Sequence, residues 1–178
     1  MSSRRLKRLV GTAVAVTGAA IVAVGPATPA PSDLAAAKKI TAAGVGGVKL
    51  GKSYQRLRQQ GLVKKIRKGC ELGGPNARSA RLRAPLDGGV NFTLKSPRRV
   101  TDIFVRGGAK ARGVGIGAKI PAIKAAFPKA KVEHGAEAMF ALTLVNIPKN
   151  GGGRLQFGVS TKTKRTTVIG IPFIVFCE

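Results

Sequence analysis

The chain has 178 residues, with 32 lysines and arginines against seven acids and a formal net charge of +25. It contains two cysteines, one histidine, one tyrosine and no tryptophan. A single histidine excludes a histidine-rich zinc site, and so few aromatic residues exclude a nucleic-acid site built on base stacking.

Residues 1–37 are expected to be a secretory signal peptide. The basic segment SSRRLKRLV precedes the apolar run GTAVAVTGAAIVAVG, and the alanines at 35–37 form a cleavage site before Lys38. A retained membrane anchor is the alternative, but the uncharged run from Val10 to Gly25 has 16 residues, against roughly 20 needed to span a bilayer. We therefore expect a secreted protein, either released or associated with the cell wall. Its mature chain keeps 28 basic and six acidic residues, a charge of +22.

The mature chain is expected to be a short linker, 38–43, and one globular domain, 44–178, made of two repeats at about 44–110 and 111–178. GVKLGKSYQRLRQQ (47–60) aligns with GVGIGAKIPAIKAA (113–126) at an offset of 66 residues. Arg99 to Ile103 align with Arg165 to Ile169 at the same offset, and GVNFTL (89–94) aligns with RLQFGV (154–159) at 65.

Each repeat is predicted to contain a short helix followed by about three antiparallel strands, which makes the fold class α+β. The first helix follows Ser53, a typical N-cap residue, and the second lies between Pro121 and Pro128. Strands are predicted where apolar residues alternate. These residues are Leu82, Ala84 and Leu86; Val90, Phe92 and Leu94; and Phe140, Leu142 and Leu144.

The segment GVKLGKSYQRLRQQG resembles the start of the helix in the repeats of secreted β-lactamase-inhibitor-like proteins. Similar units occur in the small lipoprotein of the outer-membrane barrel assembly machinery. Those repeats often carry a cysteine soon after the helix, where this chain has Cys70. Where they commonly have Gly-Met-Thr, this chain has Gly51-Lys52-Ser53 and Gly117-Ala118-Lys119. The resemblance implies an extracellular binding module and transfers no binding residues.

The glycines of RGVGIGA formally fit a dinucleotide-binding fingerprint through Gly113, Gly115 and Ala118. The two prolines that flank the second helix leave it too short for such a unit, and similar glycines recur at 47 and 51. We interpret them as turn residues of the repeat and expect no cofactor.

Cys70 and Cys177 are expected to form a disulfide, because an isolated cysteine pair in an exported chain is most simply bridged. Free thiols or an intermolecular bridge are the alternatives. The bridge would close a loop of about a hundred residues and contribute roughly 4 to 5 kcal/mol in the chain-entropy treatment.

No catalytic constellation is visible, so we expect a protein that is not an enzyme and has no small-molecule substrate. His134 lies in KVEHGAE with Glu133 and Glu137, which indicates either a weak surface metal site or an exposed polar turn. We favour the turn and expect no metal.

Clustered basic residues are the remaining functional signal. They are expected to bind polyanions and comprise Lys64, Lys65, Arg67, Lys68, Arg78, Arg81, Arg83, Arg98 and Arg99. Without stacking aromatics, such binding would follow charge and would not select a nucleic-acid sequence. The expected function is a secreted basic binding module for cell-wall phosphate polymers, anionic lipid or extracellular DNA. The alternative is a protein-binding or inhibitor module with an acidic extracellular partner.

Overall fold

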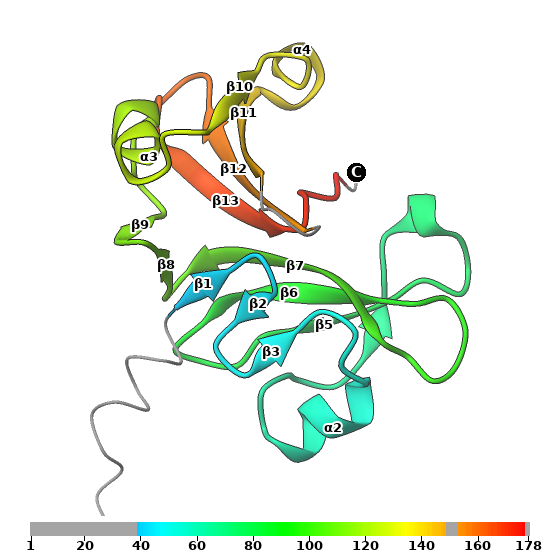
Figure 1. Ribbon diagram of the computed structural model, residues 1–178. Coiled ribbons are helices and arrows are strands. Elements are labelled where there is room, and N and C mark those ends of the chain that lie inside the picture. The colour runs from blue at the N-terminus through cyan, green and yellow to red at the C-terminus, as the bar shows by residue number, and fades with distance from the viewer. Residues whose placement is uncertain (1–38, 149–152, 177–178) are drawn as a thin grey trace, which may run out of the picture.

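An eight-stranded antiparallel sheet dominates the structure, a computed structural model that describes residues 39–148 and 153–176 (Figure 1). In spatial order its strands are β10 (Lys131–Glu133), β11 (Leu142–Pro148), β12 (Arg154–Ser160), β13 (Thr166–Ile171), β7 (Val100–Gly107), β6 (Asp87–Phe92), β5 (Arg78–Arg81) and β4 (Arg67–Lys68). Two small sheets contain β1 (Ile40–Thr41), β2 (Gly44–Val45) and β3 (Val48–Lys49), and β8 (Lys110–Ala111) and β9 (Val114–Gly115). The helices are α2 (Tyr54–Gln59), α3 (Ile120–Ala126), α4 (Glu137–Phe140) and the 3-10 helix η1 (Glu71–Gly73).

The predicted fold class is wrong. We expected an α+β fold of two repeats, each with a helix and about three strands, but strands predominate and β13 pairs with β7 to make one continuous sheet. The helices α2, α3 and α4 have only six, seven and four residues. The prediction missed the edge strands β4 and β10, because both are short and largely charged and show no clear apolar alternation.

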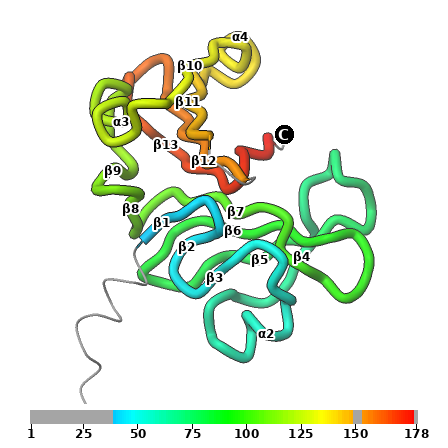
Figure 2. Tube along the Cα trace, viewed as in Figure 1, coloured from blue at the N-terminus to red at the C-terminus, as the bar shows by residue number. Residues whose placement is uncertain are grey.

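The two halves of the chain meet where β7 and β13 pair, with the blue-to-green half on one side and the yellow-to-red half on the other (Figure 2). The predicted signal peptide lies outside the described residues. Strand β1 begins at Ile40, whose side chain is buried, within the segment that we expected to be a linker.

The hydrophobic core lies between one face of the sheet and the helices α2 and α3. Leu57 of α2 and Ile123 of α3 are fully buried, and they belong to the same cluster as Ile103, Phe157 and Ile169 of the sheet. Helices this short are not stable alone in water. Burial of one central side chain against the sheet therefore holds each helix in place.

Positions 66 residues apart make matching contacts. The N–H of Gly51 and that of Gly117 each donate a 2.8 Å hydrogen bond, to the carbonyls of Val100 and Thr166. Each of those two residues follows an arginine, Arg99 or Arg165, whose guanidinium donates back to the glycine carbonyl at 3.1 Å. The sequence match at this offset therefore corresponds to equivalent backbone geometry.

The glycines of the RGVGIGA segment serve turns. Gly113 has φ +81° in the two-residue turn between β8 and β9, and Gly117 has φ +84° where the chain approaches α3. Glycine adopts such positive φ values without the steric cost that other residues incur. This agrees with the interpretation of the motif as turn geometry.

Candidate anion-binding surface

Seven of the nine predicted basic residues come together at the β4 end of the sheet. Segment 62–68 runs antiparallel to segment 78–83 through the bridge between Val63 and Leu82, and Arg67 is paired with Ser79. We call these seven residues the basic edge. They are Lys64, Lys65, Arg67, Lys68, Arg78, Arg81 and Arg83.

Apolar anchors hold the basic edge on the sheet. Val63 and Leu82 are buried, and the half-buried Ile66 packs against the core. The backbone N–H of Ile66 donates a 3.0 Å hydrogen bond to the hydroxyl of Tyr54 on α2. These apolar residues alternate with the cations. Their packing therefore holds the backbone of the segment on the sheet, while Lys64 and its neighbours stay exposed to water.

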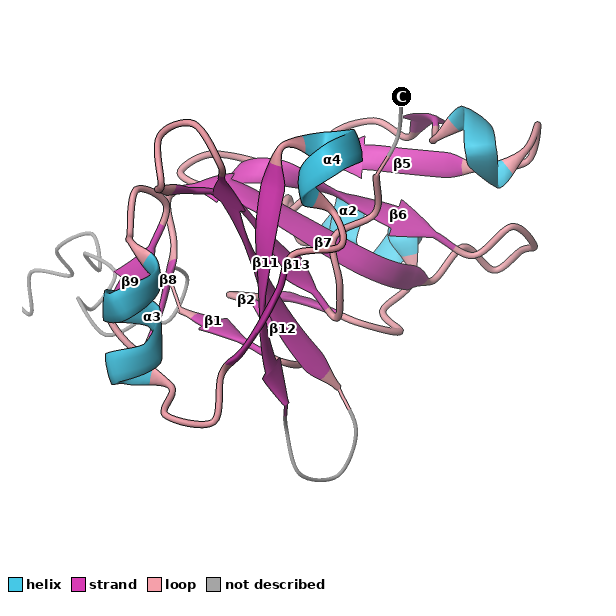
Figure 3. Ribbon diagram, turned by 90° about the horizontal axis from the view of Figure 1, so that it is seen from above, coloured by secondary structure: helices cyan, strands magenta, loops and turns pink. Residues whose placement is uncertain are grey.

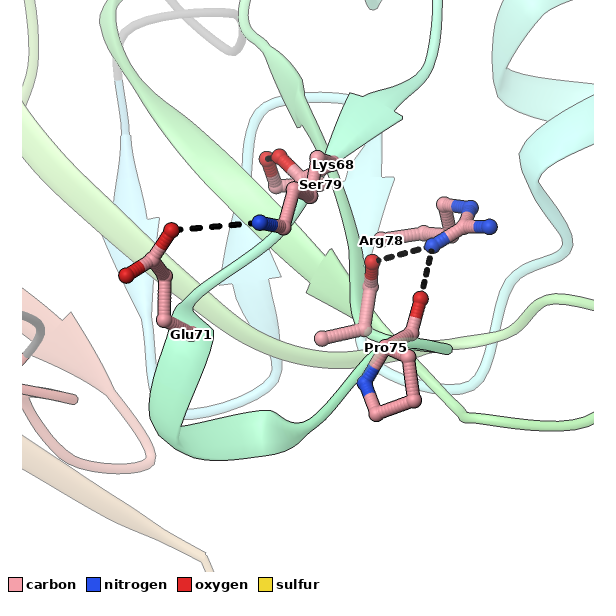
Figure 4. Close-up of polar contacts among 6 residues, drawn as sticks. Lys68, Glu71, Pro75, Arg78 and Ser79 are labelled. Atoms are coloured by element: carbon pink, nitrogen blue, oxygen red, sulfur yellow. Dashed lines mark hydrogen bonds and ion pairs between the residues drawn. The ribbon is translucent and has the colours of Figure 1, made fainter.

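Two members of the basic edge have local partners (Figure 4). Lys68 forms a 3.1 Å ion pair with Glu71, and the guanidinium of Arg78 donates to the carbonyls of Pro75 and Ala77 at 2.8 Å. Exposed pairs such as the first contribute only about 0–1 kcal/mol to stability. The other five form no ion pair within the described residues, and they are Lys64, Lys65, Arg67, Arg81 and Arg83.

The other two predicted residues, Arg98 and Arg99, donate hydrogen bonds to backbone carbonyls, and their part in polyanion binding stays a prediction. They lie between β6 and β7, where the Arg98 guanidinium donates to the backbone carbonyls of Asn76, Thr93 and Leu94. Arg99 donates to the Gly51 carbonyl. Both side chains therefore hold loops together, which local charge density alone could not reveal.

The face of the sheet opposite the core carries a second group of polar residues. Arg67, Ser79, Asn91 and Asp102 are register partners across β4, β5, β6 and β7, so their side chains share one face. Arg106 of β7 lies on the same face, with its guanidinium 5.3 Å from the centroid of the Phe104 ring. Sequence analysis missed Arg106, which is a single cation in an apolar strand.

Two cavities open on this face. One has a volume of about 370 Å³ and is lined in part by Arg67, Phe104 and Arg106, and the other, of about 520 Å³, is lined in part by Leu72 and Leu94. They share the lining residues Cys70, Asn91, Val175 and Phe176.

The C-terminal segment 172–176 forms the wall that the two cavities have in common. Its Ile174 N–H donates a 2.8 Å hydrogen bond to the side-chain carbonyl of Gln156, and Phe176 stacks on Phe140 of α4 with centroids 3.9 Å apart. Figure 3 shows the segment ending near α4. The cavities could not be predicted from local sequence, because they exist only when this segment folds back onto the sheet.

Asp102 is 6% exposed at the wall of the larger cavity. The side-chain amide of Asn91 donates to its carboxylate at 2.7 Å, and the hydroxyl of Thr101 donates at 2.9 Å. Burial raises the pKa of the Asp102 carboxyl, and these two hydrogen bonds oppose the increase.

Cys70 lies close to the residue that precedes its predicted disulfide partner. Its sulfur is 4.0 Å from the carbonyl oxygen of Phe176, the residue before Cys177. Cys177 lies outside the described residues, so the bridge stays a prediction.

The segment around His134 is structured. It contains β10 and α4, and His134 Nδ1 lies 2.6 Å from an oxygen of Glu137 that also accepts a 2.5 Å hydrogen bond from Thr143. The hydrogen bond from Thr143 and the contact with His134 lower the pKa of the Glu137 carboxyl. Within residues 39–148 and 153–176, no group of three metal-ligating side chains is placed to hold an ion.

No family model, curated protein or solved structure matches this chain. The resemblance to β-lactamase-inhibitor-like repeats is therefore carried by its short motif alone, and function has to be argued from geometry and charge. No helix in the described part of the chain is long and apolar enough to cross a membrane.

Proposed function

We propose that this protein is a secreted, non-enzymatic module that binds phosphate-bearing polymers through the basic edge. One observation carries the proposal: antiparallel pairing of 62–68 with 78–83 concentrates seven cations, and only Lys68 among them has an acidic partner in the described structure. Unpaired cations at this density repel one another, and a polyanion relieves that repulsion.

Binding at the basic edge should follow phosphate density. Each lysine or arginine that neutralises a phosphate releases a condensed counterion, so the logarithm of the binding constant falls linearly with the logarithm of salt concentration. The ring of Tyr54 is half-buried, and its hydroxyl accepts a hydrogen bond from the Ile66 N–H. Tyr54 is therefore held by the fold, which supports contact between the exposed cations and a polymer backbone.

The test compares two variants with equal charge loss. The edge variant replaces the five unpaired cations of the basic edge by alanine, and the control variant replaces five exposed lysines of the other half of the chain. The control lysines are Lys119, Lys124, Lys129, Lys131 and Lys162. Binding to duplex DNA and to a teichoic-type polymer is measured by fluorescence anisotropy of the labelled polymer over a salt series.

The edge variant is expected to lose up to about 4.5 units of salt slope on DNA, at roughly 0.9 per phosphate contact. The control variant is expected to lose clearly less, because its lysines lie on or beside α3, in β10 and after β12, in the other half of the chain. Equal losses of salt slope in both variants would mean that net charge alone determines binding and that the basic edge is not a specific site. A parent protein that binds neither polymer at low salt would overturn the proposal in favour of an acidic protein partner.

A further inference from the structure

The two cavities on the open face of the sheet lie next to each other. They share four lining residues, and each has a volume in the range of about 300–1,000 Å³ that is typical of small-molecule sites. The common wall is the C-terminal segment, which hydrogen bonding at Ile174 and stacking at Phe176 fix in place. Both cavities therefore border the C-terminal segment 172–176, and we consider them together as one site.

The ends of this site differ in chemistry. The smaller cavity is lined in part by Arg67 and Arg106, and neither forms an ion pair within the described residues. The larger cavity has Leu72 and Leu94 in its wall, which are 77% and 52% exposed. Large apolar side chains grouped at the surface beside a cavity often mark a binding site. One end therefore suits an anion and the other an apolar chain.

The two acidic residues of the site already have polar partners within the protein. Glu71, at the smaller cavity, pairs with Lys68. Asp102, at the larger one, is buried and accepts hydrogen bonds from Asn91 and Thr101. Neither carboxylate pairs with Arg67 or Arg106, so no acid among residues 39–148 and 153–176 neutralises either guanidinium group.

We propose that this site binds a single-chain anionic amphiphile, with its carboxylate or phosphate head at Arg67 and Arg106 and its tail along Leu72 and Leu94. Guanidinium groups bind either head through charge-assisted hydrogen bonds. The ligand differs from the polymers of the proposed function because it needs the apolar end. Arg106, Leu72 and Leu94 are not part of the basic edge, so the two proposals can fail separately.

The experiment is calorimetric titration of the secreted chain with dodecanoate and dodecyl phosphate, each below its critical micelle concentration. Acetate and inorganic phosphate test the anionic head groups alone, and dodecanol tests the alkyl tail alone. Arg106→Gln removes one cation of the site, and Arg112→Gln is its control, because Arg112 lies over Phe127 at a similar 5.2 Å. Leu72→Ser combined with Leu94→Ser removes the apolar end.

Met139→Ser is the control for the apolar change, since Met139 is 76% exposed and lies outside both cavities. At least one of the two dodecyl anions is expected to bind, and whichever binds more tightly identifies the head. Arg106→Gln and the double leucine variant are each expected to weaken its binding about tenfold, as loss of a charged hydrogen bond or of buried apolar area would.

The proposal fails if neither dodecyl anion binds, or if acetate, phosphate or dodecanol binds as tightly as the dodecyl anions do. It also fails if Arg106→Gln and the double leucine variant bind like the parent, or if the two controls lose as much affinity as they do. The comparison of ligands uses only the parent protein, so the proposal can still be tested if a variant does not fold.

Discussion

Replacing Tyr54 by phenylalanine should loosen the basic edge without removing any of its charge. The change deletes the hydroxyl that accepts the Ile66 N–H at 3.0 Å, while the ring keeps its edge-to-face contact with Phe92, where the centroids are 5.6 Å apart. A buried donor left without a partner costs about 1–3 kcal/mol. Since Ile66 is only half-buried, we expect a loss at the lower end of this range, about 1 kcal/mol in the free energy of unfolding.

Two measurements follow this change. Urea unfolding should be monitored by circular dichroism, because Tyr54 is the only tyrosine of the chain and no tryptophan replaces its fluorescence. Hydrogen exchange should show the Ile66 amide losing at least about fivefold protection, since 1.4 kcal/mol corresponds to a factor of ten and 1 kcal/mol to about five. The exposed neighbour Gln55, changed to alanine, is the control. Unchanged exchange at Ile66 would refute the claim that this hydroxyl holds the segment.

Three further predictions concern Asp102, Arg99 and the two cysteines. Burial raises the pKa of the Asp102 carboxyl above its ordinary value of 3.8, so the folded state binds the carboxyl proton more tightly than the unfolded state does. The protonated carboxyl therefore contributes to the free energy of unfolding in full below pH 3.8, and this contribution is lost as pH rises through the raised pKa. Urea unfolding should therefore show Asp102→Asn gaining stability relative to the parent as pH rises through this window, and a constant difference would contradict it. Arg99→Ala should lower the free energy of unfolding by about 0.5–1.5 kcal/mol, because Arg99 donates a hydrogen bond to the Gly51 carbonyl. The same change should leave the salt slope of DNA binding unaltered. A reduced slope would place Arg99 in the binding surface. Non-reducing mass spectrometry of secreted protein should find Cys70 and Cys177 bridged, with two hydrogens fewer than the dithiol, and free thiols would contradict it.

Local patterns in the sequence predicted α2 and α3. The Ser53 side chain accepts a 3.4 Å hydrogen bond from the N–H of Arg56, and Leu57 is fully buried, as the spacing indicated. Pro121 lies in the first turn of α3. These features depend on residues within one turn of each other, so a single segment contains the necessary information.

Strand ends and strand partners were harder to predict. Val90 and Phe92 are buried as the alternation indicated, but β6 ends at Phe92 and Leu94 is exposed. Phe140 lies in α4, and Leu142 and Leu144 are only partly buried because Val145 provides the buried contact of β11. Periodicity shows that a segment alternates, whereas its end and its inward face depend on a partner strand that lies elsewhere in the chain.

The candidate site shows the same division between local and long-range information. Charge density identified Lys64 and its neighbours, but the sequence did not indicate that segment 62–68 pairs with 78–83. It also could not separate Arg98, which bonds to loop carbonyls, from cations that remain unpaired. The cavity beside Arg106 needs the C-terminal segment to cross the sheet, a contact between parts of the chain about seventy residues apart.

The two ends of the sheet show that the charge of the basic edge exceeds what a sheet edge needs. Exposed edge strands are commonly guarded by charged side chains against pairing with other chains. Strand β10 occupies the opposite edge with both signs, Lys131 and Glu133, and is followed by Glu137. Segment 62–68, at the corresponding place in the other half, has four cations and no acid. Mixed charge suffices at β10, so edge protection alone does not account for four like charges, which carry a cost in self-repulsion. A polyanion at this edge offsets that cost, and the β10 edge, where charges of both signs already lie side by side, gains much less from one.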